Sequence, residues 1–349
     1  ASERYIYTKL NRITREIYKE SDDAILEYIN DDGSIVEPVY YAPIIPMILV
    51  NGSKGIGTGF STDIMCYNPL MIIDYLQRVI KNKPTDDMEF LPYYKGFQGT
   101  IEKINESKCI IKGNYNVKGN KVNITELPIG TWTDDYKEFI EKLMEGDKSK
   151  KTLIKDYNDI STDQTIDITI TFHPGVVDDL LKKVSDDTNG LEKYLKLYTT
   201  RTTTNMHMFD ENEKLKKFEG VKDIIDYFIQ IRLELYVKRK ENLLKTLEKE
   251  VMILKNKKRF ITEILKDIID LRGKKKKDLT LMLEKSKYDK QEEDYKYLIQ
   301  LPMDSVTEEN VKHLNMVEEK KSNELKELND SIPSNMWFQE LEILKDKLQ

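Results

Sequence analysis

Four glycines surround one lysine and one isoleucine in the run Gly-Ser-Lys-Gly-Ile-Gly-Thr-Gly, which extends from Gly52 to Gly59. Glycine permits positive φ and has no side chain to block another surface, so this loop is suited to close backbone contact. Lys54 is a natural neighbour for a phosphate group. The chemistry that this run could support is therefore contact with a phosphate-bearing partner, or close packing against the protein's own core.

Ile56 is the one large apolar residue among these glycines. It is either a plug that enters the protein's own core or a wedge that enters a partner, and from the loop alone the core plug is the commoner case. The loop has neither the Gly-x-x-x-x-Gly-Lys-Ser/Thr pattern of a phosphate loop nor the spacing of a dinucleotide fingerprint. It therefore does not indicate a site for ATP or NAD.

Composition narrows the possible classes of protein. The chain has 349 residues, enough for two or three domains, and a formal net charge of −6, which argues against wholesale attraction to nucleic acid but leaves local basic faces possible. Its two cysteines, Cys66 and Cys109, lack metal-ligand spacing, and its three histidines are scattered. No signal peptide opens the sequence and no apolar run approaches ~18 residues, so we expect no membrane insertion and an intracellular, reducing compartment.

Apolar spacing predicts how this loop is positioned. Ser2 is a plausible helix cap, and an opening helix would place four apolar residues on one face, within a region 1–30 of two short helices that ends in an acidic turn. Asn68-Pro69 begins a further amphipathic helix. Alternating residues then predict strands at 100–104, 109–113, 121–128 and 165–172, hence an antiparallel sheet. The four apolar residues of the opening helix are Ile6, Leu10, Ile13 and Ile17.

After Gly220 the apolar residues follow three-four spacing, which predicts a coiled-coil helix over about 221–271, roughly 75 Å long at ~1.5 Å per residue. A helix of this length needs a partner, and the apolar residues of 311–328 supply one that runs back along it. The intervening residues, including the lysine run 274–277, should form a small cap. The lysine run itself is expected to be a solvated loop, with a contact to DNA as the less common alternative. The stripe of the first helix consists of Leu233, Val237, Leu244, Leu247, Val251, Leu254, Ile261, Leu265 and Ile268.

Taken together, these segments resemble the type IIA DNA topoisomerases over almost the whole chain. Glu-Arg-Tyr-Ile-Tyr-Thr at 3–8 resembles the arginine–tyrosine element that ends the winged-helix domain. The stretch 37–59 resembles the longest signature of the eukaryotic and large-DNA-virus enzymes. Ile-Thr-Glu-Leu-Pro at 124–128 with Thr-Trp-Thr at 131–133 resembles the tower domain, and 202–210 resembles the segment leading to the coiled coil. Tyr-Lys-Tyr-Leu at 295–298 and Ser-Asn-Met-Trp at 334–337 resemble the exit gate.

The resemblance implies that Tyr5 is the nucleophile and that Arg4 is a ligand of the scissile phosphate. A phenol with an ordinary pKa near ~10 is a weak nucleophile at neutral pH and needs help from a cation or a metal. Attack on phosphorus conserves the phosphodiester energy in a phosphotyrosine, so the strand can be resealed without spending ATP on the bond.

The resemblance also implies roles in DNA binding. Ile56 becomes the wedge that intercalates into duplex DNA at a bend, where an apolar tip partly unstacks a base step. Lys54 lies beside it in the same loop. Arg12 and Arg15, on the opening helix, are candidates for contact with the DNA backbone, against the alternative of a solvated helix face.

The implied architecture is α+β and multidomain. Residues 1–68 form the end of the winged-helix region with the glycine-rich loop, 69–220 the tower with its antiparallel sheet, and 221–349 an antiparallel coiled-coil hairpin with a small helical tip. The implied partners are double-stranded DNA, a second copy of the chain bound through the exit gate, and upstream domains. Neither the Glu-Gly-Asp-Ser and Asp-x-Asp elements of the metal-binding domain nor an ATP-binding domain occurs in this sequence. We therefore expect Mg²⁺ and ATP to bind outside it.

Two alternatives remain, one from another class of protein and one from the same class. A non-catalytic coiled-coil protein that organises DNA would also use a long antiparallel hairpin, but it has no reason to place Arg4 and Tyr5 ahead of a glycine-flanked isoleucine. A bacterial gyrase A subunit is the nearer alternative. The Glu-Pro-x-Tyr-Tyr form at 37–41 argues against it. For the eukaryotic or viral type, the expected location is the nucleus or a viral replication site inside the host cell.

Overall fold

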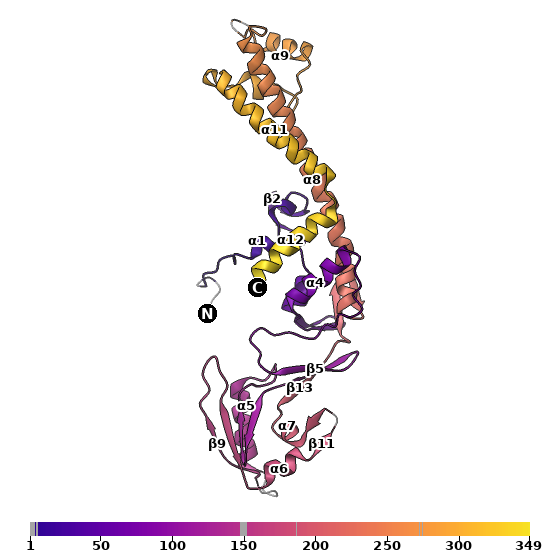
Figure 1. Cartoon of the computed structure of the whole chain (residues 1–349), viewed down its shortest axis with the longest axis vertical. Coiled ribbons are helices and arrows are strands. Elements are labelled where there is room, and N and C mark those ends of the chain that lie inside the picture. Colours follow the sequence, from indigo (N-terminus) through magenta and orange to yellow (C-terminus); the bar gives the residue numbers. More distant parts are fainter. Residues whose placement is uncertain (1–3, 5, 147–151, 186, 272, 274) are drawn as a thin grey trace. The chain divides into compact units, whose positions relative to one another are not determined.

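Figure 1 shows the computed structural model of the chain, which describes residues 4, 6–146, 152–185, 187–271, 273 and 275–349. Helices and antiparallel strands occur together, as expected for the α+β class. The chain divides into two compact units, residues 1–44 with 229–349 and residues 45–228. The three-domain division at 68 and 220 remains a prediction, since it follows the implied roles of the segments and not their compactness.

The glycine-rich segment of the unit 45–228 forms a two-stranded antiparallel hairpin, β3 (Ser53–Gly57) with β4 (Phe60–Ile64). It follows α3 (Met47–Asn51) and precedes α4 (Pro69–Ile80). The start of α4 agrees with the prediction: the side-chain oxygen of Asn68 accepts a hydrogen bond from the backbone N–H of Leu70 at 2.9 Å, and Pro69 occupies the first turn.

Two antiparallel sheets follow in the same unit. The four-stranded sheet has the order β7-β8-β10-β9 and the three-stranded sheet the order β13-β6-β5. The predicted strand at 165–172 begins three residues late, because Thr165 belongs to the turn before β10, where its C=O accepts a hydrogen bond from the N–H of Thr162. The strands are β5 (Thr100–Asn105), β6 (Lys108–Lys112), β7 (Tyr115–Lys118), β8 (Lys121–Ile124), β9 (Ile154–Asp159), β10 (Ile168–Phe172) and β13 (Tyr198–Thr202).

Helices cover one face of the four-stranded sheet. The inward residues of β10 alternate with half-buried ones and meet buried residues of α5 (Thr133–Glu145), α6 (Val176–Leu181) and α7 (Gly190–Tyr194). Two further hairpins complete the unit. They are β11 (Val184–Ser185) with β12 (Thr188–Asn189), and β14 (Met206–Phe209) with β15 (Leu215–Phe218).

The long helix α8 (Val221–Leu265) passes from one unit into the other and, in the second, lies beside α11 (Glu308–Asp330) (Figure 1). Lys240 donates to the carbonyl of Asn329, whereas Lys258 pairs with Glu318 at 2.5 Å. The later residue of α8 thus contacts the earlier residue of α11, so the two helices are antiparallel, as the spacing predicted. Residues Val311, Leu314, Val317, Leu325 and Leu328 of α11 are half-buried.

The predicted stripe of α8 is correct in the middle and wrong at both ends. Val251 and Ile261 are buried, but Val237, Leu265 and Ile268 are exposed. At the first end the helix instead buries Tyr236 against α12 (Pro333–Leu348). At that end the partner changes from α11 to α12, and the buried face changes with it. At the other end the helix stops at Leu265 and not at 271 as predicted, so Ile268 lies beyond it.

A small helical cap joins α8 to α11, as predicted. It has a core of its own, made by Phe260, Ile269, Leu283, Tyr288, Tyr295 and Leu298. Its elements are α9 (Lys276–Lys285), α10 (Lys296–Ile299) and η2 (Met303–Ser305). The lysine run was expected to lie in a solvated loop. Lys274 is outside the described residues, and the end of the run instead belongs to the first turn of α9.

The prediction of an opening helix is wrong over most of its length. Residues 6–11 have no regular secondary structure, and the segment continues with two short helices, α1 (Thr14–Ile17) and α2 (Glu20–Asp23). Ile17 is buried, but Ile6 and Leu10 are exposed. A short amphipathic helix needs a surface on which to bury its apolar face, and the described residues provide none for Ile6 or Leu10.

The acidic turn at 30–33 is present, but it connects strands. It joins β1 (Tyr28–Asp31) to β2 (Ser34–Pro38), with positive φ at both Asp32 and Gly33, as a tight hairpin turn requires. Among the described residues, no helix has the length and apolar content that a membrane span requires.

Candidate functional site

The hairpin of β3 and β4, residues 53–64, carries the glycine run, and we name it the Ile56 hairpin. Ile56 pairs with Ser61 across its ladder, and Gly57 pairs with Phe60 next to the turn. Gly59 lies in that turn with φ of +83°, a conformation that favours glycine. The register therefore places Ile56 at the end of the hairpin, one residue pair before the turn.

Ile56 is 94% exposed. It is therefore not a plug into the core formed by the described residues, and the commoner of the two interpretations drawn from the loop is wrong for this chain. A large apolar side chain held in solvent at the tip of a hairpin is suited to enter a partner. Lys54, two residues earlier and also exposed, shares the face of β3 on which Ile56 lies.

The glycines of the hairpin serve different purposes. A side chain at Gly57 would meet the ring of Phe60 at 2.6 Å, so the ring, which packs against Phe209, would have to shift to make room for it. A side chain at Gly55 would meet nothing within 4 Å. Gly55 thus has no internal packing requirement, and its bare backbone next to Ile56 leaves room for a surface that approaches from outside.

The predicted cleavage residues lie in the other unit. Tyr5 is outside the described residues, so its geometry stays a prediction. Arg4 and Arg12 are exposed. Arg15 is exposed as well, but its guanidinium pairs with the carboxylate of Asp23 at 3.0 Å. Arg12 and Arg15 are near each other in sequence at α1, and Lys54 and Ile56 share the Ile56 hairpin. The two pairs belong to separate units.

A buried cluster of charged side chains joins α2 of the opening segment to α8 and α12, and it was not predicted from the sequence. The carboxylate of Asp22 in α2 lies 2.6 Å from Arg232 and 3.4 Å from Arg239, both on α8. Arg239 also pairs with Glu340 of α12 at 2.8 Å. The cluster therefore ties the opening segment to two helices that are more than 200 residues away in sequence. Two arginines seven residues apart on an otherwise apolar helix face were the signal that could have revealed it.

The ring of Tyr236 lies between these arginines. The two guanidinium carbons are 4.4 and 4.1 Å from its centre, and its hydroxyl donates to Glu340 at 2.5 Å. Burial raises the pKa of Tyr236, so the phenol is neutral at physiological pH. Trp337 stacks on the same ring, and its Nε1–H donates to the carbonyl of Ile44. Trp337 belongs to the motif at 334–337 whose place in the exit gate stays a prediction, and in this structure it contacts Ile44 and Tyr236.

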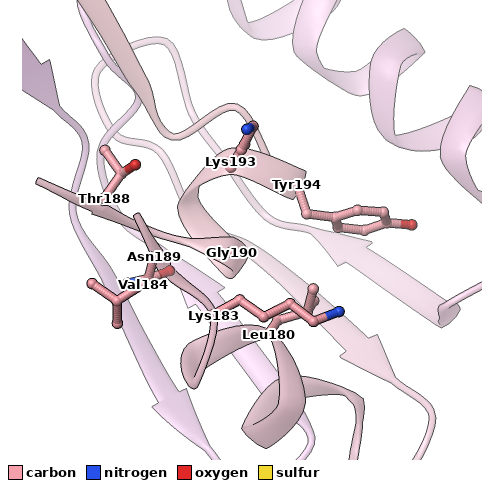
Figure 2. Close-up of a pocket in the computed structure, with 8 residues that line it drawn as sticks. All are labelled: Leu180, Lys183, Val184, Thr188, Asn189, Gly190, Lys193 and Tyr194. Atoms are coloured by element: carbon pink, nitrogen blue, oxygen red, sulfur yellow. The ribbon is translucent and has the colours of Figure 1, made fainter. Parts of the chain in front are cut away.

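The described part of the chain contains no group of three or more His, Cys, Asp or Glu side chains arranged to hold a metal ion. A pocket of about 390 Å³ lies between α6, the β11–β12 hairpin and α7, where Lys183 and Lys193 flank its rim (Figure 2). Both lysines are exposed, and Gly190 also lines the pocket, at a position where a side chain would meet the carbonyl oxygen of Leu180 at 2.7 Å. This lining has no nucleophile beside a base, so the Ile56 hairpin remains the better candidate.

The chain is similar to known proteins over nearly its whole length. The family model for the A subunit of DNA gyrase/topoisomerase IV matches residues 1–342. DNA topoisomerase 2 of Plasmodium falciparum is 38% identical over 99% of this chain and 26% of that relative, and DNA topoisomerase 2 of Acanthamoeba polyphaga mimivirus is 34% identical over 98% of this chain and 32% of that relative. The chain thus spans about a quarter to a third of these relatives.

A solved structure is similar over the full chain. The crystal structure of the Plasmodium falciparum topoisomerase II DNA-binding, cleavage and re-ligation domain has a TM-score of 0.85 and 38% identity, and it covers 100% of this chain and 50% of that one. These relatives are eukaryotic and viral, and they favour neither a coiled-coil DNA-organising protein nor a bacterial gyrase A subunit. With a family model that matches almost every residue, the chain belongs to the type IIA DNA topoisomerases, in the DNA-binding and cleavage region of that family.

Proposed function

We propose that this chain is the DNA-binding and cleavage part of an ATP-dependent type IIA topoisomerase, which breaks both strands of one duplex, passes another duplex through and reseals the break. The observation that carries the proposal is Ile56, a lone apolar residue exposed at the tip of a glycine-rich hairpin. A solvent-exposed isoleucine has no stabilising role in the folded chain, whereas an apolar wedge between base steps kinks a duplex.

Cleavage is assigned to Tyr5. Its phenolic oxygen gives up its proton and attacks phosphorus, a 5′-phosphotyrosyl ester forms as the bond from phosphorus to the 3′ oxygen breaks, and the 3′ oxygen leaves as a hydroxyl after gaining a proton. The reverse reaction restores the phosphodiester bond. Arg4 is assigned the role of neutralising charge on the phosphate, since a guanidinium pairs well with phosphate oxygens. Mg²⁺ and ATP are expected to bind in regions outside this chain.

The finer architecture of the proposal follows the family. Residues 1–68 end a winged-helix region, 69–220 form the tower, and α8 with α11 form the hairpin whose tip closes an exit gate against a second copy. Exposed apolar side chains at that tip support a homodimer, and they include Ile268, Leu281 and Met303. Double-stranded DNA is the substrate, and the nucleus or a viral replication site is the expected location.

The test of cleavage is Tyr5→Phe in the complete enzyme. The change removes only the hydroxyl, so DNA binding and dimerisation should persist while cleavage, relaxation and decatenation are lost. Denaturing the wild-type enzyme on DNA with Mg²⁺ should trap protein on 5′ ends, with the adduct mapped to Tyr5. An adduct on another residue, or residual cleavage by the variant, would refute the assignment.

The test of bending is Ile56→Ala. Phosphate contacts dominate affinity, so DNA binding should change little, whereas the bend should decrease because the wedge is gone. Energy transfer between dyes at the two ends of a short duplex measures the bend. Wild-type bending by this variant would count against a wedge at Ile56.

A further inference from the structure

The Ile56 hairpin is supported by a second hairpin of the same unit, formed by β14 and β15, which we name the backing hairpin. The residue just before β14, Asn205, accepts a hydrogen bond through its backbone carbonyl from the N–H of Asp63, at 2.8 Å. At the outer end of β14, the ring of Phe209 meets the ring of Phe60 edge-on, with centroids 5.7 Å apart. Both contacts fall on β4, so the backing hairpin holds the strand opposite Ile56 and leaves Ile56 itself exposed.

The side chain of Asn205 reinforces this arrangement. Its Nδ2 donates to Oγ of Ser61 at 2.9 Å, and Ser61 is the residue paired with Ile56 across the ladder. Its Oδ1 lies 2.9 Å from Nδ1 of His207. An amide oxygen can only accept, so the Nδ1 of His207 carries the hydrogen and donates it. The amide of Asn205 is thus fixed at both ends, and it holds the rung of the ladder that presents Ile56.

Two further contacts hold the rest of β4. Arg201, at the end of β13, pairs with the carboxylate of Asp63 at 3.0 Å, and both side chains are partly buried. Phe60 lies across the site where Gly57 has no side chain, so the ring that meets Phe209 also packs over the turn end of β3. The hairpin is therefore held at the rung of Lys54 through Asp63, at the rung of Ile56 through Ser61, and at its turn through Phe60.

The Ile56 hairpin needs such support for a physical reason. A two-stranded hairpin alone is marginally stable in water, and glycine has more conformational freedom to lose than any other residue. This hairpin pairs only two strands and has glycine at three of its residues from 55 to 59. A wedge that unstacks a base step must resist the force with which the duplex straightens. A glycine-rich hairpin without backing would yield before the DNA does.

We propose that the backing hairpin holds Ile56 in the position from which it bends DNA, with Asn205 and Phe209 as positioning residues. The inference rests on the proposed wedge function of Ile56. On this proposal Asn205 and Phe209, which do not enter the duplex, set how far the DNA bends.

The first experiment measures hydrogen exchange in the free chain, without DNA. Asn205→Ala and Ser61→Ala remove the same hydrogen bond from opposite sides, so each should speed exchange of the amides of residues 53–64 about three- to tenfold. The double variant should be no faster than Asn205→Ala alone, since the bond to Ser61 can be lost only once and Asn205→Ala also removes the contact with His207. The control is Asn212→Ala, because Asn212 lies in the turn of the backing hairpin and contacts Glu211. Unchanged exchange in both single variants would overturn the inference.

The second experiment measures bending of a dye-labelled duplex by the same variants and by Phe209→Ala. Bending should fall toward the level of Ile56→Ala while affinity stays within about twofold, and Asn212→Ala should bend DNA as wild type does. If Ile56→Ala reduces bending but the Asn205, Ser61 and Phe209 variants do not, the positioning role is wrong and the wedge stands. If Ile56→Ala itself bends normally, the proposed function fails, and the positioning role fails with it.

Discussion

Asp22→Ala should be among the most destabilising single changes in the unit that contains the opening segment. The carboxylate of Asp22 is 2% exposed and lies between Arg232 and Arg239, each 1% exposed. Removing one partner of a buried ion pair costs about 3–5 kcal/mol, because the other charge stays buried and unpaired. Arg239 retains the carboxylate of Glu340 at 2.8 Å, whereas the neighbours that Arg232 keeps are uncharged, the carbonyl of Ala42 at 3.4 Å and the ring of Tyr236. One uncompensated guanidinium remains, so we expect a loss of about 3 kcal/mol in the free energy of unfolding.

The neighbouring carboxylate provides the control. Asp23 pairs with Arg15 at 3.0 Å, but the two side chains are 42% and 57% exposed. Exposed pairs contribute about 0–1 kcal/mol, so Asp23→Ala should be nearly neutral. The two variants differ by one position in the same short helix, and burial is what separates them.

Urea unfolding followed by tryptophan fluorescence measures the difference. The chain has two tryptophans, Trp132 and Trp337, and Trp337 stacks on the ring that lies between the two arginines. In a Trp132→Phe background Trp337 reports on the cluster alone. At an m-value of about 2 kcal/mol/M, a loss of about 3 kcal/mol moves the midpoint by about 1.5 M.

A second substitution identifies the cause of the loss. Adding Arg232→Met to Asp22→Ala removes the orphaned charge and should recover part of the stability. If Asp22→Ala is no more destabilising than Asp23→Ala, or if Arg232→Met deepens the loss, the burial argument is refuted.

Three further predictions concern other parts of the chain. Gly57→Ala should destabilise the Ile56 hairpin by about 1–3 kcal/mol through its clash with Phe60, seen as faster amide exchange, whereas Gly55→Ala should leave exchange unchanged and weaken DNA binding. Met303→Glu at the tip should convert dimers to monomers in sedimentation velocity, whereas Met316→Glu, exposed on the shaft, should not. The hydrogen bond from Lys137 lowers the pKa of Asp159 to about 2, so Lys137→Met should raise that pKa, as an NMR titration would detect. The stability that this pair adds is present above pH ~4 and lost toward pH 2, so wild type and variant should converge in acid.

The sequence by itself determined the elements that depend on near neighbours. Asn68 and Pro69 start α4 because a cap and a fixed φ act within one turn of helix. The three-four spacing of α8 and α11 predicted an antiparallel pair, since a long helix with one apolar stripe must bury it against another helix. The role of Tyr5 came only from resemblance, because one tyrosine among twenty carries no local signal of reactivity.

Tertiary structure decided everything that depends on which surfaces meet. The glycine run left Ile56 either buried or exposed, and only the pairing of β3 with β4 puts it in solvent. Asn205 and Asp22 look like ordinary polar residues in sequence, yet one holds the Ile56 hairpin and the other joins two arginines from a distant helix. The opening helix was predicted from its spacing, but periodicity shows only that a face could be buried. Whether it is buried depends on a partner surface that local sequence does not encode.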